Sequence, residues 1–263
     1  MEVRVQQNIE YPLKDFDGRD FLETAAFTLP DLLAISQYAK NMTTDTAKEE
    51  CDQTCDVTFV TEEDIPEVID FLKIYFFQDE PMNTYLQLGE CRELEEYATH
   101  CIPEKCSFKA TNSKGEIIGV FLNGVIHKPV KDAEPASYAK DCKHEKFRKI
   151  LTLFEHIETI FNLFDLYPEY ECALDGKILA VNSNYRGLGI AGKLTSRTIE
   201  YMKEHNIPLF HVMCSSKYSA RVCEKLGFDE VFSLPFLDYV VNGENPLLPA
   251  DPHNEIKVMA KRI

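Results

Sequence analysis

The run 178–193 constrains the fold of this chain more than any other segment. It begins as an apolar strand, passes through a polar spacer at 182–185 and ends in a glycine-rich turn that holds Gly187, Gly189 and Gly192. Glycines let the backbone curl so closely that several N–H groups point at one spot, and the helix that follows adds the positive end of its dipole. This order of strand, turn and helix predicts an α/β arrangement around a ligand that carries a phosphate.

The composition is that of an ordinary globular protein with room for one sizeable core. Of the 263 residues, 44% are hydrophobic and 27% are charged. The longest uncharged apolar run, 117–126, is shorter than the roughly 20 residues that cross a bilayer. The first residues also lack the apolar stretch of a secretory signal. We therefore expect a cytoplasmic protein that is monomeric and has no role at membranes.

The acidic balance and the cysteines narrow the possible partners. A net charge of −16 argues against nucleic-acid binding, which needs basic surface, and favours small cationic partners through long-range attraction. The nine cysteines are spread singly except for Cys51 and Cys55, and no histidine lies near that pair to complete a zinc site. We expect reduced thiols and no bound metal.

Apolar periodicity predicts a mixed sheet with helices on its faces, an α/β (α+β) fold. Residues 1–55 are expected to form a partly flexible N-terminal extension with a short helix at 31–42, ahead of one domain at 56–263. Strands are expected at 57–60, 107–110, 117–126, 177–182, 208–214, 229–240 and 255–261. Helices are expected at 61–80, 84–99, 146–164, 188–205 and 217–226, with a loop at 129–142.

Two kinds of phosphate-bearing ligand fit a glycine-rich turn. The segment Gly187–Gly192 matches the G-x-G-x-x-G fingerprint of dinucleotide-binding folds. In those folds the glycines directly follow the first strand, and an acid that binds ribose lies about 20 residues further on. Here the turn lies deep in the domain behind a polar spacer, and 209–216 holds no such acid. These departures argue against a nicotinamide cofactor.

The spaced form of the turn, with an arginine that opens it after a strand, resembles the pyrophosphate-binding motif of the GNAT acetyltransferase superfamily. In this sequence the motif is Arg186-Gly187-Leu188-Gly189-Ile190-Ala191. More specific landmarks resemble the insect arylalkylamine N-acetyltransferases, and they are Phe76–Asn83, Leu174–Ile178, Cys214–Arg221, Pro252-His253 and Lys257–Lys261. The resemblance covers about residues 56–262. It implies the GNAT fold, a mixed central sheet with a splayed pair of strands and helices on both faces.

The resemblance also implies acetyl-CoA as the co-substrate. The strand before the turn would lie beside the pantetheine arm, and the turn would hold the pyrophosphate. The residues implied in cofactor binding are Leu179, Ala180, Val181, Arg186, Gly187, Leu188, Gly189, Ile190, Ala191, Gly192, Lys193 and Ser219. No metal is implied.

Acetyl transfer to an amine needs a base, because an aliphatic ammonium group has a pKa of about 10. The resemblance implies Glu80 as that base, acting directly or through water, and Ser219 as the acid that protonates the CoA thiolate. Ser215 would hold the amine or the water chain, and Tyr218 is a second candidate donor. The alternatives are an exposed acid at a helix end for Glu80 and helix-capping roles for the serines.

The resemblance implies a small cationic aromatic amine as the acceptor, such as dopamine, serotonin, tyramine or octopamine. Phe76 and Phe77 are candidates for an aromatic slot, whereas His211 is expected to be a packed core histidine. The residues expected to bind the amine are Asp79, Glu80, Pro81, Met82, Tyr97, Asp175 and Ser215. A polyamine or protein-lysine acetyltransferase remains an alternative, as does a catalytically silent regulator that binds acetyl-CoA. A hydrolase based on Ser215 is disfavoured, since the sequence around it lacks the nucleophile-elbow pattern.

Overall fold

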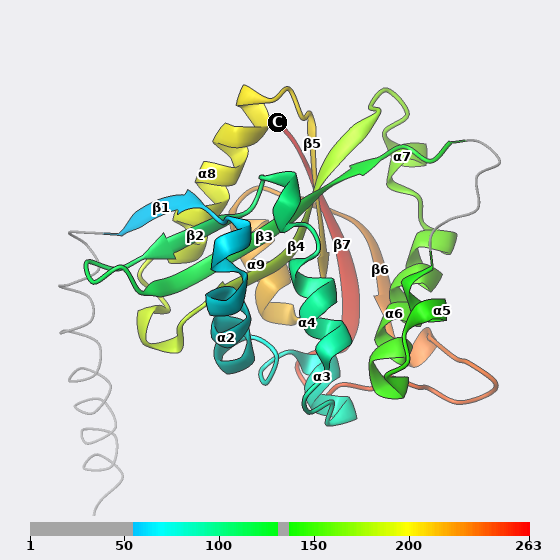
Figure 1. The fold of residues 1–263 in the computed structure, drawn as a ribbon. Helices are drawn as coiled ribbons and strands as arrows, with labels where there is room; N and C mark the ends of the chain where they lie inside the picture. Colours follow the sequence, from blue (N-terminus) through cyan, green and yellow to red (C-terminus); the bar gives the residue numbers. More distant parts are fainter. Residues whose placement is uncertain (1–54, 131–136) are drawn as a thin grey trace, which may run out of the picture. The chain divides into compact units, whose positions relative to one another are not determined.

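The computed structural model describes residues 55–130 and 137–263, which all belong to one compact unit, Thr46–Ile263. The expected N-terminal extension and its helix at 31–42 lie outside the described residues. The described strands form a seven-stranded sheet in the order β1-β2-β3-β4-β5-β7-β6 (Figure 1). Neighbouring strands are antiparallel except for β4 and β5, which run parallel. The predicted mixed sheet is confirmed.

The strands alternate with helices along the chain. The strands are β1 (Asp56–Phe59), β2 (Phe108–Thr111), β3 (Ile117–His127), β4 (Cys172–Val181), β5 (Leu209–Cys214), β6 (Asp229–Pro235) and β7 (Glu255–Arg262). The helices are α2 (Ile65–Tyr75), α3 (Pro81–Leu86), α4 (Arg92–Thr99), α5 (Tyr138–Asp141), α6 (Glu145–Ile160), α7 (Leu163–Leu166), α8 (Ile190–Glu204) and α9 (Lys217–Lys225).

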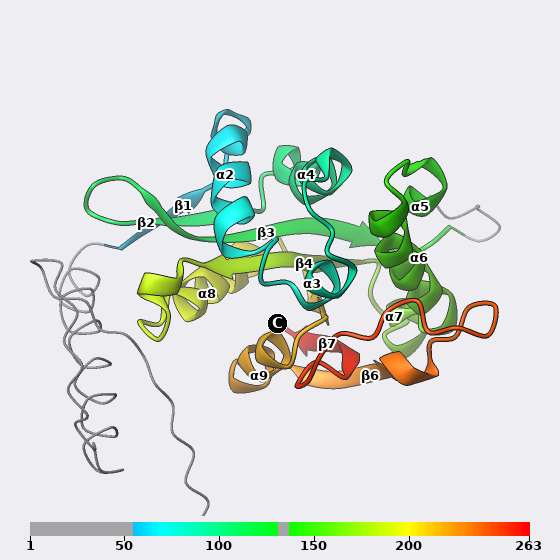
Figure 2. The same cartoon turned by 90° about the horizontal axis from the view of Figure 1, so that it is seen from below.

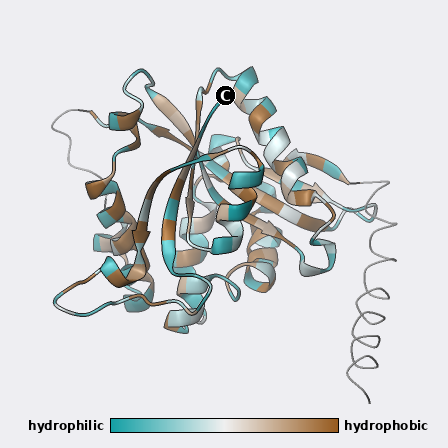
Figure 3. Cartoon of the chain, turned by 180° about the vertical axis from the view of Figure 1, so that it is seen from behind, coloured by the Kyte–Doolittle hydropathy of each residue, from teal (hydrophilic) through white to brown (hydrophobic). Residues whose placement is uncertain are grey.

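Helices cover both faces of the sheet, as expected. Helix α8 packs on β1 to β4 and α9 packs on β5 to β7, whereas α2 contacts β3 and β4. Seen from below, α2 and α4 lie on one side of β3 and β4, and α8 lies on the other (Figure 2). Helix α8 buries one side, which includes Leu194, Thr198 and Met202. Hydrophobic and hydrophilic residues accordingly both colour this helix in Figure 3.

The two helices predicted around Pro81 have different bounds in the structure. The expected helix at 61–80 already ends at Tyr75, because Phe76 leaves the helical region with a φ of −134°. The expected helix at 84–99 is divided into α3 and α4, since Gln87 and Gly89 take positive φ values of 49° and 71°. The sequence-based prediction of these boundaries is therefore wrong.

Other boundaries shift by less. Strand β4 begins five residues before its predicted start at 177, and β6 ends at Pro235 because a 3-10 turn follows at Phe236–Asp238. The helix expected at 146–164 is divided into α6 and α7, and the described part of the loop expected at 129–142 contains α5. The β2–β3 hairpin, α8, β5, α9 and β7 lie within two residues of their predicted bounds.

Strands β4 and β5 pair over only three residues and then separate. Their ladder runs from Leu174 opposite Phe210 to Gly176 opposite Val212. At the same level β4 bulges against β3, because Leu122 pairs with Ile178 while the next residue of β3 pairs with Gly176, which leaves Lys177 as the extra residue. A Cβ at Gly176 would lie 2.9 Å from the Phe121 ring, so only glycine fits there. The predicted splayed pair of strands is confirmed, and we call the place where it opens the fork.

Candidate active site

Beyond the fork, β4 offers one unpaired backbone edge. Leu179, Ala180 and Val181 pair with β3 through Phe121, Val120 and Gly119, but they have no ladder partner on the β5 side. Their side chains pack into the cores on the two faces of the sheet. An extended ligand could therefore add to the sheet here through main-chain hydrogen bonds, as the predicted pantetheine contact requires.

The glycine-rich turn follows β4 after a short 3-10 helix at Ser183–Tyr185. Gly187 and Gly189 have positive φ values of 81° and 78°, which glycine adopts without strain, and a Cβ at either would meet no atom within 4 Å. The first N–H groups of α8, which begins at Ile190, have no partner within the helix. Arg186 and Lys193 are exposed beside them. The turn thus leaves backbone donors and two cations open to an anion. The Ile190 side chain is buried, so that residue can contribute only its N–H.

Arg186 also joins the turn to the segment before α3. Its Nη2 lies 3.0 Å from Asp79 Oδ2, and both side chains are more than half exposed. The structure therefore places Asp79 beside the glycine-rich turn, where Arg186 engages its carboxylate. Its predicted contact with an amine would compete with that ion pair.

Glu80 is the N-cap of α3 and is buried, with 8% of its surface exposed. Its Oε2 accepts a hydrogen bond of 2.7 Å from the Asn83 N–H, while Oε1 has no partner among the described residues. Burial raises the pKa of Glu80 above its usual value, and the Asn83 N–H and the Ser215 hydroxyl oppose that rise. The alternative of an exposed acid at a helix end does not fit. A buried carboxyl with a raised pKa and one free oxygen suits a proton acceptor.

The two predicted serines have different surroundings. Ser215 follows β5, and its hydroxyl is among the groups that lower the pKa of Glu80. Ser219 lies in the first turn of α9, where its N–H donates to Ser216 Oγ at 3.0 Å and its Oγ donates to the Ser216 carbonyl at 2.9 Å. Ser216, rather than either predicted serine, therefore caps this helix. Tyr218 is exposed, and its ring packs edge-on against His253.

Just before the fork lies a largely buried polar cluster, made of Asp175, Lys177 and His211, whose side chains are 12–17% exposed. Asp175 Oδ2 lies 3.0 Å from Lys177 Nζ, and Asp175 Oδ1 lies 2.9 Å from His211 Nδ1. Burial alone would raise the pKa of Asp175, but Lys177 and His211 hold it well below its usual range. Both oxygens of Asp175 are engaged, which leaves its predicted contact with the amine without a free acceptor atom. His211, which is expected to be a packed core histidine, has a side chain that is 12% exposed, and its polar partner Asp175 is not indicated by the sequence pattern.

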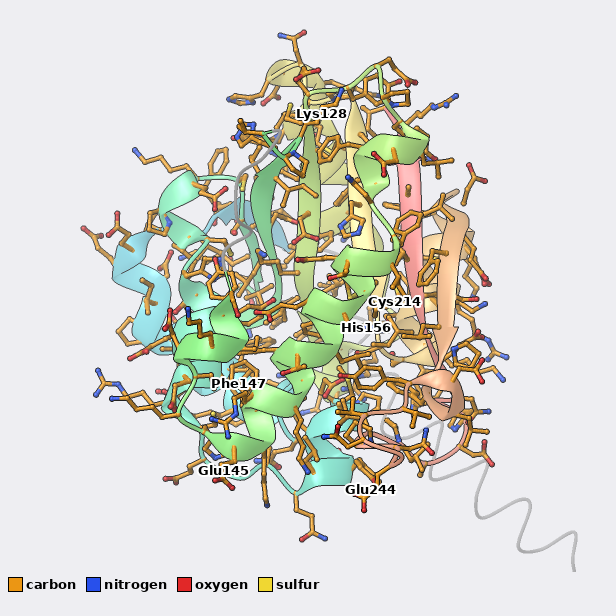
Figure 4. All side chains as sticks on the ribbon, turned by 90° about the vertical axis from the view of Figure 1, so that its right-hand side faces the viewer. Lys128, Glu145, Phe147, His156, Cys214 and Glu244 are labelled. Atoms are coloured by element: carbon orange, nitrogen blue, oxygen red, sulfur yellow. The ribbon has the colours of Figure 1, made fainter. Side chains whose placement is uncertain are left out.

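The aromatic residues expected to form one slot lie along two adjoining clusters. Met82 is fully buried in a core beneath α6, with Phe77 and Tyr97 at its edge, and Phe76 packs against a second core around α2. Phe77 packs against both cores, and its ring meets that of Phe76 edge-on with centroids 6.1 Å apart. Tyr97 makes edge-on contacts with the rings of Tyr138 and Phe147, the latter labelled on α6 in Figure 4. Burial raises the pKa of Tyr97 to about 12, so its hydroxyl stays protonated. Pro81 is buried as the first residue of α3.

Comparison with known proteins agrees with this geometry. Residues 138–228 match the model of the acetyltransferase (GNAT) family. The chain contains a GNAT acetyltransferase domain. It is similar to the crystal structure of arylalkylamine N-acetyltransferase 2 from Aedes aegypti, at 26% identity over 80% of this chain and 100% of that chain, with a TM-score of 0.75.

Two further structures are similar to the GNAT domain in fold. A mosquito arylalkylamine N-acetyltransferase like 5b is 22% identical, and a Drosophila melanogaster polyamine N-acetyltransferase is 20% identical. Each match covers 80% of this chain and 100% of the other, with a TM-score of 0.71. These similarities establish the fold of the domain and leave open which amine it uses.

Several residues of the site are missing from the sequence-based prediction. Asn83 stands three residues after Glu80, the spacing at which an N–H reaches an N-cap side chain, so a helix start at Pro81 would have revealed it. Lys177 stands two residues after Asp175, which puts both side chains on one face of a strand. The pairing of Cys214 with Cys223 has no local signal.

The described ranges contain no group of three or more His, Cys, Asp or Glu side chains arranged to hold a metal ion. Within the same residues, every helix is too short or too polar to cross a membrane.

Proposed function

We propose that this GNAT domain is an arylalkylamine N-acetyltransferase, which moves the acetyl group of acetyl-CoA to the primary amine of dopamine, serotonin, tyramine, octopamine or a similar compound. The observation that carries the proposal is the buried Glu80 carboxyl, which has one oxygen without a partner and lies beside Ser215 at the fork. The similarity to an Aedes aegypti arylalkylamine N-acetyltransferase supports this class of substrate.

Acetyl-CoA fits the residues around the fork. The unpaired edge of Leu179–Val181 suits the amide groups of a pantetheine arm, and the N–H groups at 187–192 suit a pyrophosphate. Arg186 and Lys193 would add their charges, with Arg186 exchanging Asp79 for a phosphate oxygen. The bound co-substrate supplies an activated acetyl thioester next to Glu80 and Ser215.

The proposed chemistry begins with proton removal. Glu80 accepts a proton from the ammonium group through its free oxygen, directly or through one water held by Ser215. The neutral nitrogen then attacks the thioester carbonyl, the new C–N bond forms and the C–S bond breaks. The nitrogen loses its second proton as the amide forms, and that proton replaces the one that Ser219 gives up. The CoA thiolate takes a proton from Ser219, whose hydroxyl must first turn away from the Ser216 carbonyl. General acid–base catalysis of this kind contributes about 10²- to 10⁴-fold to a rate.

The amine would reach Glu80 from the side of α3, α4 and α6. Pro81 and Met82 follow Glu80, and Tyr97 lies at the edge of the same apolar cluster as Met82. These residues could contact an aromatic ring, although their packing is also that of a core. Asp79 and Asp175 would act through charge rather than direct contact, since Arg186 and Lys177 already engage them.

A thiol-release assay with acetyl-CoA and a panel of amines tests the proposal. Turnover on dopamine, serotonin, tyramine or octopamine, with little on spermidine, agmatine or lysine peptides, is the expected result. Preference for the polyamines or the peptides would replace the arylalkylamine assignment with the alternative acetyltransferase classes. Binding of CoA without turnover on any amine would favour the catalytically silent regulator.

A further inference from the structure

Two cysteines of different elements meet beneath the proposed catalytic serines. Cys214 is the last residue of β5, labelled in Figure 4, and Cys223 lies on α9. Their sulfur atoms are 3.7 Å apart, within hydrogen-bond distance, and the two residues are 1% and 7% exposed. No other pair of described cysteines has a sulfur–sulfur contact of this kind.

Each of the two cysteines lies close in the chain to one of the proposed catalytic serines. Ser215 is the residue after Cys214, and Ser219 lies four residues before Cys223, one turn away on the same side of α9. A change in the distance between the sulfur atoms therefore shifts the serines relative to each other. A misplacement of about 1 Å at a reacting group can cost roughly 10²-fold in rate.

A pocket reaches Cys214, one member of this pair. Cys214 lines a pocket between α9 and the segment before β7, together with Ser216, Arg221, Pro252 and Lys257. The hydrogen bond between the two sulfur atoms lowers the pKa of the Cys214 thiol, with a smaller contribution from Ser219. The same contact raises the pKa of Cys223. Cys214 is therefore the better nucleophile of the two.

We propose that Cys214 and Cys223 form an oxidisable dithiol, which a small peroxide converts to a disulfide that slows acetyl transfer. The Cys214 thiolate attacks the O–O bond, which breaks to give a sulfenic acid and release an alcohol or water. Cys223 then attacks that sulfur, the S–S bond forms and water leaves. In total, two thiols lose two hydrogen atoms and one peroxide is reduced.

Closing the bond draws β5 and α9 together. The sulfur atoms must approach from 3.7 Å to about 2.05 Å. Rotation of the two cysteine side chains supplies part of this approach, and we infer that helix α9 or the end of β5 moves for the rest and carries Ser215 and Ser219 with it. A thiol reductant reverses the change, because no step beyond the disulfide is involved.

Peptide mapping by mass spectrometry tests the modification on the full-length protein after brief treatment with hydrogen peroxide. A cross-linked species of the Cys214 and Cys223 peptides, lost again with dithiothreitol, is the expected result. Cys142→Ala is the matched control, since Cys142 is as buried as Cys223, but within the described residues its Sγ donates to the His144 carbonyl and makes no sulfur–sulfur hydrogen bond. Cys223→Ala should yield no such species. Oxidation confined to other cysteines would overturn the proposal.

The effect on the reaction rests on the proposed function and is measured as the ratio of activities with and without peroxide for each variant. We expect this ratio to fall about tenfold or more in the wild type and in Cys142→Ala, and to stay near one in Cys214→Ala/Cys223→Ala. A cross-link without loss of activity would overturn the regulatory part. The mapping does not depend on turnover, so a failure of the amine assay leaves the two proposals distinguishable.

Discussion

The regions on the two sides of the fork each bury a carboxyl group and treat it differently. Before the fork, Asp175 has both oxygens engaged by Lys177 and His211, and its pKa is held well below the usual range. Beyond it, Glu80 has one oxygen bonded and one free, and burial raises its pKa. Pairing rather than burial therefore decides the direction of the shift. The paired carboxyl stabilises the fold, whereas the incompletely paired one is available for proton transfer.

The sheet explains this difference. Where β4 and β5 are paired, Asp175 stands directly opposite His211, so the ladder itself fixes the partners. Past Gly176 and Val212, β4 and β5 have no further ladder pairs with each other in the described part of the chain. Glu80 lies at the start of α3, outside the sheet, and the hydroxyl of Ser215, which follows β5, lowers its pKa. A region that must admit ligands cannot also satisfy every polar atom with protein.

Removing the unpaired carboxyl should have the largest effect on the reaction. Glu80→Gln keeps the shape of the side chain but cannot accept a proton, so we expect kcat/KM at neutral pH to fall about 10²- to 10⁴-fold. Initial rates over a range of amine concentrations at saturating acetyl-CoA measure the change. Urea unfolding is the control. Burial raises the pKa of Glu80 in the folded state. The stability that this group contributes is therefore fully present below its unfolded pKa and is lost as pH rises through its folded pKa. At neutral pH we expect Glu80→Gln to be at least as stable as the wild type. A loss of stability that parallels the loss of rate would contradict the assignment.

Breaking the paired carboxyl should instead affect stability. Lys177→Met leaves Asp175 buried beside His211 alone, and removal of one partner of a buried pair costs about 3–5 kcal/mol of unfolding free energy. The depressed pKa of Asp175 contributes stability above its unfolded value of 3.8, which is lost as pH falls through its folded pKa. The cost should therefore be large at pH values near neutral and shrink once acid protonates Asp175.

Urea unfolding of the wild type and of Lys177→Met, at neutral pH and in acid, measures this loss of unfolding free energy. Asp175→Asn/Lys177→Met is the matched control, because it removes the buried charge as well and should recover part of the loss. An equal cost in acid and at neutral pH would show that the cluster acts by packing rather than by charge.

Ser215→Ala should have a smaller effect, which we expect in the pH dependence of the reaction. The Ser215 hydroxyl lowers the pKa of Glu80, so its removal should raise that pKa further and move the acid limb of activity to higher pH. We expect a shift of less than about one unit, as one neutral hydrogen bond contributes about 1 kcal/mol. The pH dependence of kcat/KM measures it, with Ser216→Ala as a neighbouring control. A shift toward lower pH would contradict the contact.

Asp79→Asn should have the smallest effect on stability. The ion pair of Asp79 with Arg186 is more than half exposed, and exposed pairs contribute at most about 1 kcal/mol. The same substitution removes the ion-pair partner of Arg186, which then stays available to a phosphate at the glycine-rich turn. The KM for acetyl-CoA should therefore not rise. Urea unfolding and initial rates measure the two quantities. A loss of stability as large as that of Lys177→Met would show that the pair of Asp79 and Arg186 stabilises the fold as much as the pair of Asp175 and Lys177 does.

Much of the fold follows from local patterns in the sequence. The mostly apolar run at 208–214 marks β5, the apolar residues within 255–261 mark β7, and the spacing at 146–164 marks α6. Pro81 was predicted to end a helix, but it begins α3, because proline restricts the residue before it in both cases. Asp175-Gly176 is typical of a turn, yet it continues β4, where the Phe121 ring occupies the space that a Cβ would fill.

The candidate site is less accessible to such patterns. The glycine-rich turn and Glu80 are visible through motifs, because their chemistry depends on residues adjacent in the chain. The contacts of Asp175 with His211, of Glu80 with Ser215 and of Asp79 with Arg186 join segments far apart in sequence. Only the packing of the sheet brings them together, and so the engagement of Asp79 and Asp175 could not be predicted.

The pH dependence of kcat/KM in the wild type and in Glu80→Gln tests the central claim most directly. The account predicts that the wild-type rate rises with pH through an apparent pKa above the ordinary glutamate value of 4.5. That limb should be missing in Glu80→Gln, while any limb from the amine itself remains in both. The same acid limb in both enzymes would contradict the claim that the partly unpaired carboxyl beyond the fork is the base.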